Sequence, residues 1–343
     1  MLDFGPWDRF VSLLSWCSAT TNPSLLNKAA RMEEYKTVVD DAVQYAKGVS
    51  DVSEEERMHI LIDKLAVNFG KEILQYVPGY VSTEVDARLS FDAEGSIRRA
   101  HRLIKMYEDV GVSKDRILIK LASTWEGLKA AEVLQKEGIH CNMTLMFNFY
   151  QAVVAANVGA TLVSPFVGRI YDWYKKAWGR EISAEEDPGV LSVRQIYRYF
   201  KSIGADTVVM GASFRNVGEI RALAGCDKLT INPDLLRALR ESSDPVDRVL
   251  DPESARKEYT GGRVELTESE FRFQLNGASR IHEHNEKNAF YLYCMSILVC
   301  CSCLSSLQLA EDAMATEKLA EGIRKFSEDI GKLEDFLKPL LNA

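Results

Sequence analysis

The chain has 343 residues, of which 46% are hydrophobic and 27% charged, so it is long enough to bury a large core. Its formal net charge of −8 argues against nucleic acid as a general partner, because binding a phosphate backbone calls for a basic surface. A small anionic ligand remains compatible with this charge, since a few arginines in a cleft can bind it. The odd number of cysteines and the absence of a signal-peptide pattern at the N-terminus predict a cytoplasmic protein without a disulfide framework.

Short apolar runs alternate with longer amphipathic segments along the chain. The expected strands are Val81–Asp86, Ile117–Ala122, Cys141–Phe147, Thr161–Val167, Thr207–Ala212 and Lys228–Ile231. Runs of this length suit parallel strands that are buried on both faces, and the segments between them have the pattern of helices. The alternation indicates an α/β fold. A TIM (β/α)8 barrel fits better than an open sheet, because no glycine-rich phosphate loop follows the first strand.

Capping patterns predict where three of the helices begin. A hydroxyl residue followed three positions later by Glu or Gln satisfies two orphan backbone donors at a helix start. The pairs are Ser123 with Glu126, Ser192 with Gln195, and Thr267 with Glu270.

One lysine, Lys120, lies inside the apolar run Ile117–Ala122. A lysine in such a run must be paired, reach solvent or be desolvated, and a strand-end lysine that reaches solvent is the plain alternative. Lys120 lies three residues before Ser123, near the carboxyl end of its strand, which is the catalytic face of a barrel. Because desolvation favours the neutral amine, Lys120 is a candidate nucleophile for attack on a carbonyl.

Polar residues recur near the ends of the expected strands. They are Asn22, Glu84, Asp86, Asn142, Thr144, Ser164 and Ser213. Arg169 and Arg215 follow two of the strands closely. Any one of these residues is more often a cap, a turn residue or a surface charge. Convergence of several on one rim would suit a phosphate, which arginines bind through forked, charge-assisted hydrogen bonds.

Eight segments together resemble the transaldolase family of class I, Schiff-base aldolases. They are ATTNPSL (19–25), STEVDARLS (82–90), RILIKLAST (116–124), CNMTLMF (141–147), SPFVGRIYDWY (164–174), VVMGASFRN (208–216), AGCDKLTI (224–231) and EDAMATEKLAEGIRKF (311–326). The resemblance covers residues 19–276 and 311–340. It implies a TIM barrel with a C-terminal helix, and an enzyme of the non-oxidative pentose phosphate pathway.

The reaction implied by this resemblance is transfer of a dihydroxyacetone unit from sedoheptulose 7-phosphate to glyceraldehyde 3-phosphate, giving erythrose 4-phosphate and fructose 6-phosphate. Lys120 would attack the ketose C2 carbonyl and form a Schiff base. Glu84 and Thr144 would hold the catalytic water during proton transfer. No cofactor and no metal are expected.

The same comparison, made position by position, implies the residues that bind the substrate. Those expected to contact the dihydroxyacetone hydroxyls are Asn22, Asn142 and Ser164. Those expected to hold the phosphate are Arg169, Ser213 and Arg215, with Phe166 beside the Schiff base. Sugar phosphates are the expected partners, without nucleic acid or membrane, and a homodimer is one option for the assembly.

The N-terminus departs from the family pattern. Only eighteen residues precede Ala19, and neither Asp3 nor Asp8 has the context of the family's first-strand Asp, which is the general acid/base. The first strand is therefore expected to be missing or replaced, with low turnover as a consequence. The alternative function is a catalytically impaired isoform that binds sugar phosphates or a partner subunit.

A second departure is the segment Gly277–Ala310, which interrupts the family pattern. Its latter part, Ala289–Ala310, contains no charged residue and is long enough for a membrane span. We favour a non-family insertion over a membrane anchor, and the spacing of its cysteines and histidines matches no zinc site. The expected organisation is an atypical segment 1–18, a barrel 19–276, the insertion 277–310 and a C-terminal helix 311–343.

Overall fold

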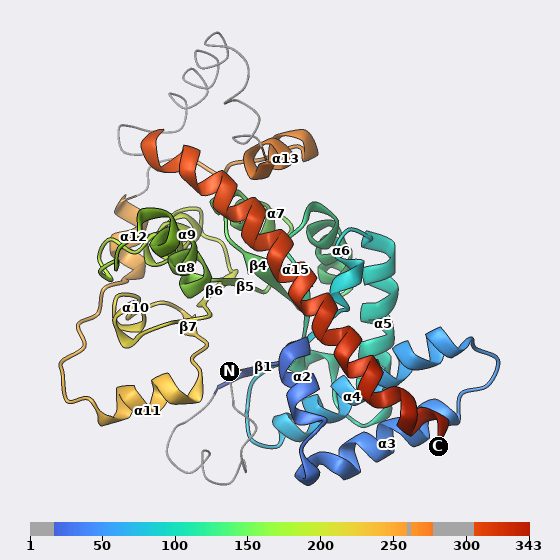
Figure 1. The fold of residues 1–343 in the computed structure, drawn as a ribbon. Helices are drawn as coiled ribbons and strands as arrows, with labels where there is room; N and C mark the ends of the chain where they lie inside the picture. The colour runs from blue at the N-terminus through green and yellow to red at the C-terminus, as the bar shows by residue number, and fades with distance from the viewer. Residues whose placement is uncertain (1–16, 259–261, 277–304) are drawn as a thin grey trace. The chain divides into compact units, whose positions relative to one another are not determined.

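The structure is a computed structural model that describes residues 17–258, 262–276 and 305–343, with side chains from residue 313 onward in the last range. In this part of the chain, seven strands follow one another in chain order in one sheet, and the register of neighbouring strands is parallel (Figure 1). The strands are β1 (Ala19–Thr20), β2 (Val81–Glu84), β3 (Ile117–Ala122), β4 (Cys141–Met146), β5 (Leu162–Pro165), β6 (Val208–Gly211) and β7 (Lys228–Leu229). All six expected strands are present, so the predicted α/β class is confirmed.

Two compact units divide the chain, and each is described by itself. The first comprises residues 1–122, 129–142 and 322–343. It contains β1 to β3, the first two residues of β4 and the C-terminal part of α15 (Ser305–Asn342), which confirms the predicted C-terminal helix. Its other helices are α2 (Pro23–Ala29), α3 (Lys36–Lys47), α4 (Glu54–Leu74), α5 (Ala93–Asp109) and most of α6 (Trp125–Lys136).

The two faces of the sheet in the first unit carry different side chains. On one face the hydroxyl of Thr83 lies 2.6 Å from that of Tyr107 on α5, which packs where Gly70 of α4 has no side chain. On the opposite face the amide of Asn142 on β4 donates to the hydroxyl of Ser82 on β2 at 3.0 Å. Because β3 lies between these two strands, this contact requires the sheet to curve toward the second face, as it does in a barrel.

The second unit comprises residues 123–128 and 143–321. It contains the rest of β4 and β5 to β7, with Leu162 beside Val208 and Met210 beside Lys228. Its helices are α7 (Phe149–Asn157), α8 (Val167–Trp178), α9 (Pro188–Ser202), α10 (Val217–Arg221), α11 (Pro233–Glu241), α12 (Pro252–Glu258), α13 (Glu268–Asn276) and the first part of α15.

The predicted cap of α6 is wrong by one residue. The hydroxyl of Thr124 accepts from the backbone N–H of Gly127 at 3.0 Å and so caps the helix. Ser123 instead donates its hydroxyl to the carbonyl of Thr144 at 2.8 Å, which fixes the end of β3 to β4. Two adjacent hydroxyl residues made the sequence pattern ambiguous at this point.

The other two predicted helix starts have opposite outcomes. Helix α9 begins before Ser192, because Asp187 caps it and proline follows at the first helical position. At α13 the prediction is confirmed, since Thr267 and Glu270 accept from each other's backbone N–H groups at 3.3 and 2.8 Å.

The two expected departures fall largely outside the described residues. Residues 1–16 and 277–304 are among those not described, so the missing first strand and the insertion remain predictions. Within the described ranges, no helix is long and apolar enough to cross a membrane.

Candidate active site

Lys120 and Glu84 form a buried ion pair in the first unit. The register of β2 and β3 sets these two residues side by side, so their side chains leave the same face of the sheet. The amine of Lys120 lies 2.7 Å from a carboxylate oxygen of Glu84, and only 6% and 5% of the two side chains are exposed. The amine also donates to the carbonyl of Thr21 at 3.2 Å. The alternative of a lysine that reaches solvent is therefore wrong.

The pairing explains how a charged lysine is tolerated inside a sheet. A buried charge is costly unless a partner of opposite sign and further hydrogen bonds satisfy it. Glu84 supplies the charge and the Thr21 carbonyl supplies a second acceptor. The same carboxylate is placed to take the proton from the amine, which the nucleophilic form requires.

Two asparagines border this face within the first unit. Asn22 is buried, and its side-chain oxygen caps α2 by accepting from the N–H of Leu25 at 2.9 Å. Asn142 is fully buried and donates to Ser82. Hydrogen bonds within the first unit thus hold both amides in fixed orientations.

An aromatic ring that sequence reasoning missed lies next to the lysine. Phe326 of α15 is 2% exposed, and the amine of Lys120 lies 5.8 Å from the centre of its ring. At this distance the cation is attracted by the ring's quadrupole. The apolar face of α15 was visible in the sequence, but the strand that it contacts lies some two hundred residues away.

The second unit holds the remaining predicted residues. Thr144 on β4 is fully buried, and its hydroxyl oxygen has no hydrogen-bond partner in the described part of the chain. A buried polar atom of this kind is ordinarily satisfied by a water or a ligand. Ser164 on β5 is also buried, and the ring of Phe166 packs edge-on against that of Phe147 at 5.5 Å.

Arg169 and Arg215 belong to two segments that touch. The N–H of Gly168, at the start of α8, donates to the carbonyl of Ser213 at 2.9 Å. A side chain at Gly168 would lie 2.3 Å from that carbonyl and 2.6 Å from Cγ of Arg215, so only glycine permits the approach. Arg169 stacks over the ring of Phe166 at 4.9 Å. The contact at Gly168 therefore brings together the two segments that carry Arg169 and Arg215, the arginines predicted to bind the phosphate.

Ser213 adopts a left-handed backbone with a φ of 65°, an uncommon conformation for a residue with a side chain. Such strain concentrates at functional sites, where the surrounding structure holds it in place. Here the carbonyl of Ser213 accepts from Gly168 and from the Arg215 guanidinium at 3.2 Å. These hydrogen bonds to the strained residue therefore hold the backbone next to Arg215 and limit where its side chain can point.

Carboxylates also surround Arg215. Its guanidinium pairs with Asp172 of α8, and its backbone N–H donates to Glu219 of α10 at 2.8 Å. Burial, reinforced by the charges of Asp187 and Asp172, raises the pKa of Glu219 to about 7. Burial likewise raises the pKa of Asp187 to about 6. Sequence reasoning missed these acidic neighbours, because they come from three separate elements: the middle of α8, the N-cap of α9 and α10.

Metal-binding side chains do not cluster in the described part of the chain. Among the described residues, no group of three or more His, Cys, Asp or Glu side chains is arranged to hold a metal ion. The cysteines and histidines whose spacing matches no zinc site lie in residues 282–303, outside the described ranges. The chemistry available at the described site is that of an amine, carboxylates, hydroxyls and guanidinium groups.

A parallel α/β fold with a buried lysine–carboxylate pair near its strand ends is the arrangement expected of lysine Schiff-base aldolases and related transferases. Comparison with known proteins narrows this class. The family described as Transaldolase/Fructose-6-phosphate aldolase matches residues 1–337. The chain belongs to this family.

Individual relatives agree with the family assignment. A protein of Kluyveromyces lactis named Transaldolase is 52% identical over 328 residues, which cover 95% of this chain and 87% of the relative. A Shewanella pealeana protein of the same name is 51% identical, over 95% of this chain and 90% of its own. The Saccharomyces cerevisiae Transaldolase is 50% identical over 99% of this chain and 91% of its own. None of these matches supports the alternative of an impaired isoform.

Proposed function

We propose that this chain transfers a dihydroxyacetone unit from a ketose phosphate to an aldose phosphate through a Schiff base on Lys120. The buried pair of Lys120 and Glu84 is the observation that carries this proposal. Family membership and the named relatives support the reaction class. The substrates are those of the non-oxidative pentose phosphate pathway, with sedoheptulose 7-phosphate as donor and glyceraldehyde 3-phosphate as acceptor.

The first half-reaction forms and uses the Schiff base. Glu84 takes a proton from the Lys120 amine, which then attacks C2 of the ketose. The carbinolamine loses water and becomes an iminium, with Glu84 and Thr144 holding the water that relays protons. Glu84, freed of its first proton when the carbinolamine loses water, then takes the proton of the C4 hydroxyl through the relay water. The C3–C4 bond breaks as this proton leaves, and the electron pair moves to the iminium nitrogen. The aldose phosphate leaves and an enamine remains on Lys120.

The second half-reaction runs these steps in reverse with another substrate. The enamine carbon attacks the aldehyde carbon of the acceptor, and hydrolysis of the new iminium frees the ketose and the lysine. Asn22, Asn142 and Ser164 retain the three-carbon unit through its hydroxyls. The steps form and break C–N, C–O and C–C bonds and move protons without net oxidation or reduction, so the proposal includes neither a cofactor nor a metal.

The phosphate is assigned to the second unit. Arg169, Arg215 and Ser213 would bind its oxygens, since guanidinium groups match a phosphate with paired hydrogen bonds. Phe166 lies beside Arg169 and would shape the neighbouring wall of the pocket. A cytoplasmic location and a homodimer complete the proposal, and both rest on sequence reasoning alone.

Borohydride trapping tests the nucleophile. Reduction in the presence of fructose 6-phosphate should attach a three-carbon adduct to Lys120, located by peptide mass spectrometry, and Lys120→Met should abolish both the label and turnover. Lys64 is a matched control, because it is also a buried lysine with an acidic partner, Asp41. A label on Lys64, or turnover that persists in Lys120→Met, would exclude the Schiff-base assignment.

A further inference from the structure

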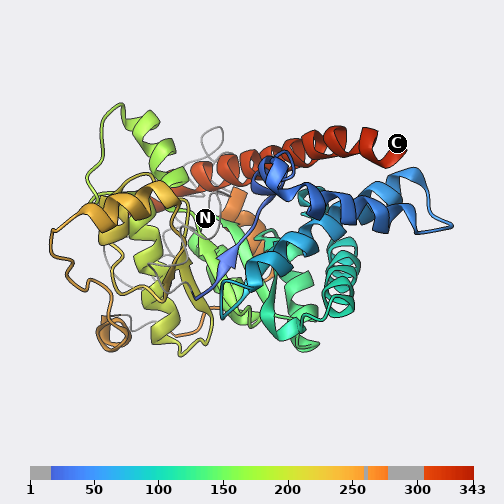
Figure 2. The ribbon, with the colours of Figure 1, turned by 90° about the horizontal axis from the view of Figure 1, so that it is seen from below.

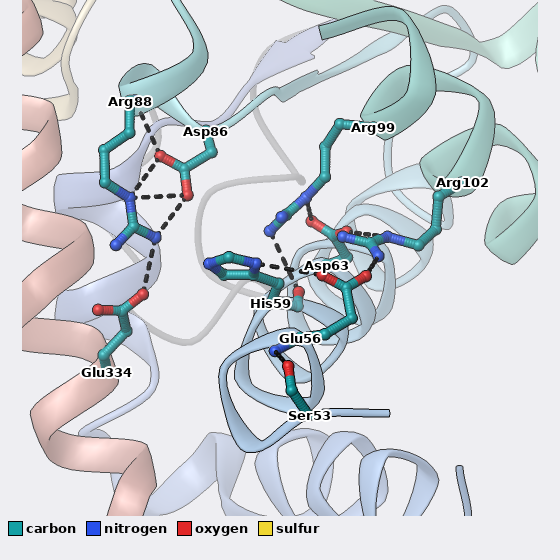
Figure 3. Close-up of polar contacts among 9 residues, drawn as sticks. All are labelled: Ser53, Glu56, His59, Asp63, Asp86, Arg88, Arg99, Arg102 and Glu334. Carbon is teal, nitrogen blue, oxygen red and sulfur yellow. Dashed lines mark hydrogen bonds and ion pairs between the residues drawn. The ribbon is translucent and has the colours of Figure 1, made fainter. Parts of the chain in front are cut away.

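Arg88 joins the end of β2 to the C-terminal helix (Figure 3). Two residues after Glu84, the carboxylate of Asp86 accepts from the Arg88 guanidinium at 2.6, 3.0 and 3.1 Å. The guanidinium also donates to Glu334 of α15 at 2.7 Å. Burial alone would raise the pKa of Asp86, but the hydrogen bonds from Arg88 bring it below its ordinary value. The carboxylate of Asp86 is therefore charged over the physiological range.

Two further contacts fix the same part of α15 within the first unit. The hydroxyl of Ser24 donates to Asp329, and the guanidinium of Arg31 donates to the carbonyl of Lys332 at 3.0 Å. Arg31 also lies over the ring of Phe336. Figures 1 and 2 both show the C-terminal half of α15, in red, beside α2, in blue. The helix is thus tied to the segments that follow β1 and β2.

The tethered part of α15 carries the ring that covers the lysine. Phe326 precedes Glu334 by eight residues, or about 12 Å along a helix. It belongs to a buried stripe that continues through Ile330 and Leu333, with Glu334 at the edge of that stripe. Because a helix moves as a rigid element, a shift or rotation at Glu334 displaces Phe326 as well.

We propose that Arg88 is a positioning residue that acts through α15, holding Phe326 over the amine of Lys120. The inference rests on the proposed function, since it takes Lys120 as the nucleophile. A ring held there excludes water from the reacting amine. Its π face also attracts the positive charge of both the ammonium and the iminium. Arg88 itself touches neither the amine nor the proposed substrate ligands in the contacts described.

A second ion network in Figure 3 supplies the structural control. Asp63 of α4 pairs with Arg99 at 2.6 Å and with Arg102 at 2.7 Å, and Arg102 also reaches Glu56. These contacts join α4 to α5 and do not involve α15. Loss of Arg102 should therefore lower stability without moving Phe326.

The test compares Arg88→Ala, Arg88→Lys, Glu334→Gln and Phe326→Leu in the full chain. It also includes the double variant of Glu334→Gln with Phe326→Leu, and Arg102→Ala as the control. The readouts are the rate of borohydride-trapped Schiff base at saturating fructose 6-phosphate, and the melting temperature. Glu334→Gln and Phe326→Leu should each slow trapping about 3- to 10-fold, and the double variant should be no slower than Phe326→Leu. Arg88→Lys, which keeps the positive charge but not the forked donors, should retain more of the rate than Arg88→Ala.

Three results would overturn the proposal. They are an unchanged trapping rate in Glu334→Gln, a double variant whose loss equals the product of the single losses, or an equal slowing in Arg102→Ala. Failure of the proposed function is a separate outcome, because the wild-type chain would then carry no label on Lys120.

Discussion

The guanidinium of Arg215 donates three hydrogen bonds to the carboxylate of Asp172, at 2.7, 3.0 and 3.2 Å. Both side chains are partly exposed, so the pair is a weak one that a stronger anion can displace. A phosphate offers the same forked geometry as the carboxylate with more charge. Asp172 therefore competes with the proposed phosphate for Arg215.

The first prediction concerns this competition. Asp172→Asn should strengthen binding of fructose 6-phosphate and inorganic phosphate by about 2- to 5-fold, as expected for removal of an exposed ion pair. The KM of the phosphorylated donor and the inhibition constant of phosphate measure the effect. Asp244→Asn is the matched control, because it removes a similar exposed partner from Arg221. A weaker affinity in Asp172→Asn would mean that Asp172 orients Arg215 for the phosphate.

The second prediction concerns the two arginines. Arg169→Ala or Arg215→Ala should raise the KM of phosphorylated sugars about 10-fold or more, because each removes charge-assisted hydrogen bonds. Unphosphorylated dihydroxyacetone donors should be affected much less. Arg180, an exposed arginine of the same unit that pairs with Glu186, provides the control substitution. Equal effects on both kinds of donor would show that the arginines are structural.

The third prediction concerns Gly168. An alanine there places Cβ 2.3 Å from the Ser213 carbonyl, so the Arg215 segment must move. Gly168→Ala should cost about 1–3 kcal/mol of unfolding free energy and raise the KM of phosphorylated donors. Gly331→Ala is the control, since a side chain at Gly331 in α15 meets no atom within 4 Å and alanine favours a helix. An unchanged KM in Gly168→Ala would mean that the contact between Gly168 and Ser213 does not contribute to phosphate binding.

Local patterns predicted most of the strands correctly, because a parallel strand that is buried on both faces must be a short, nearly continuous apolar run. β3 has the predicted bounds, Ile117–Ala122. β1, Ala19–Thr20, is only two residues long and left no such run. Helix caps were less predictable, as at Ser123 and Thr124, where adjacent hydroxyl residues compete for one role.

From the residue pattern alone, a site residue was predictable only where its own segment of the chain made it unusual. Lys120 stands out within its own strand, because a charge in an apolar run needs an explanation. Its contact with Phe326, and the pairing of Arg215 with Asp172, join residues that are distant in the chain. Periodicity predicts neither contact. It places Phe326 and Asp172 on helix faces, but it does not show which distant residue each of them meets.

The last prediction concerns the pH dependence of stability at Glu219. This side chain is fully buried, and burial together with the charges of Asp187 and Asp172 raises its pKa from 4.5 to about 7 in the folded chain. The folded state therefore binds the proton more tightly than the unfolded state. Its contribution to stability is complete below about pH 4.5 and is lost as pH rises to about 7, by up to roughly 3 kcal/mol.

Glu219→Gln removes this titration and keeps an oxygen that can accept from the Arg215 backbone. The stability of the variant relative to wild type should therefore increase between about pH 4.5 and 7 and stay constant above pH 7. Urea unfolding of both proteins at several pH values measures this difference. Substitution of the exposed Glu241 by Gln controls for the loss of one negative charge. A difference that does not change across this pH range would mean that Glu219 ionises in the folded chain at its ordinary pKa, despite its burial next to Asp187.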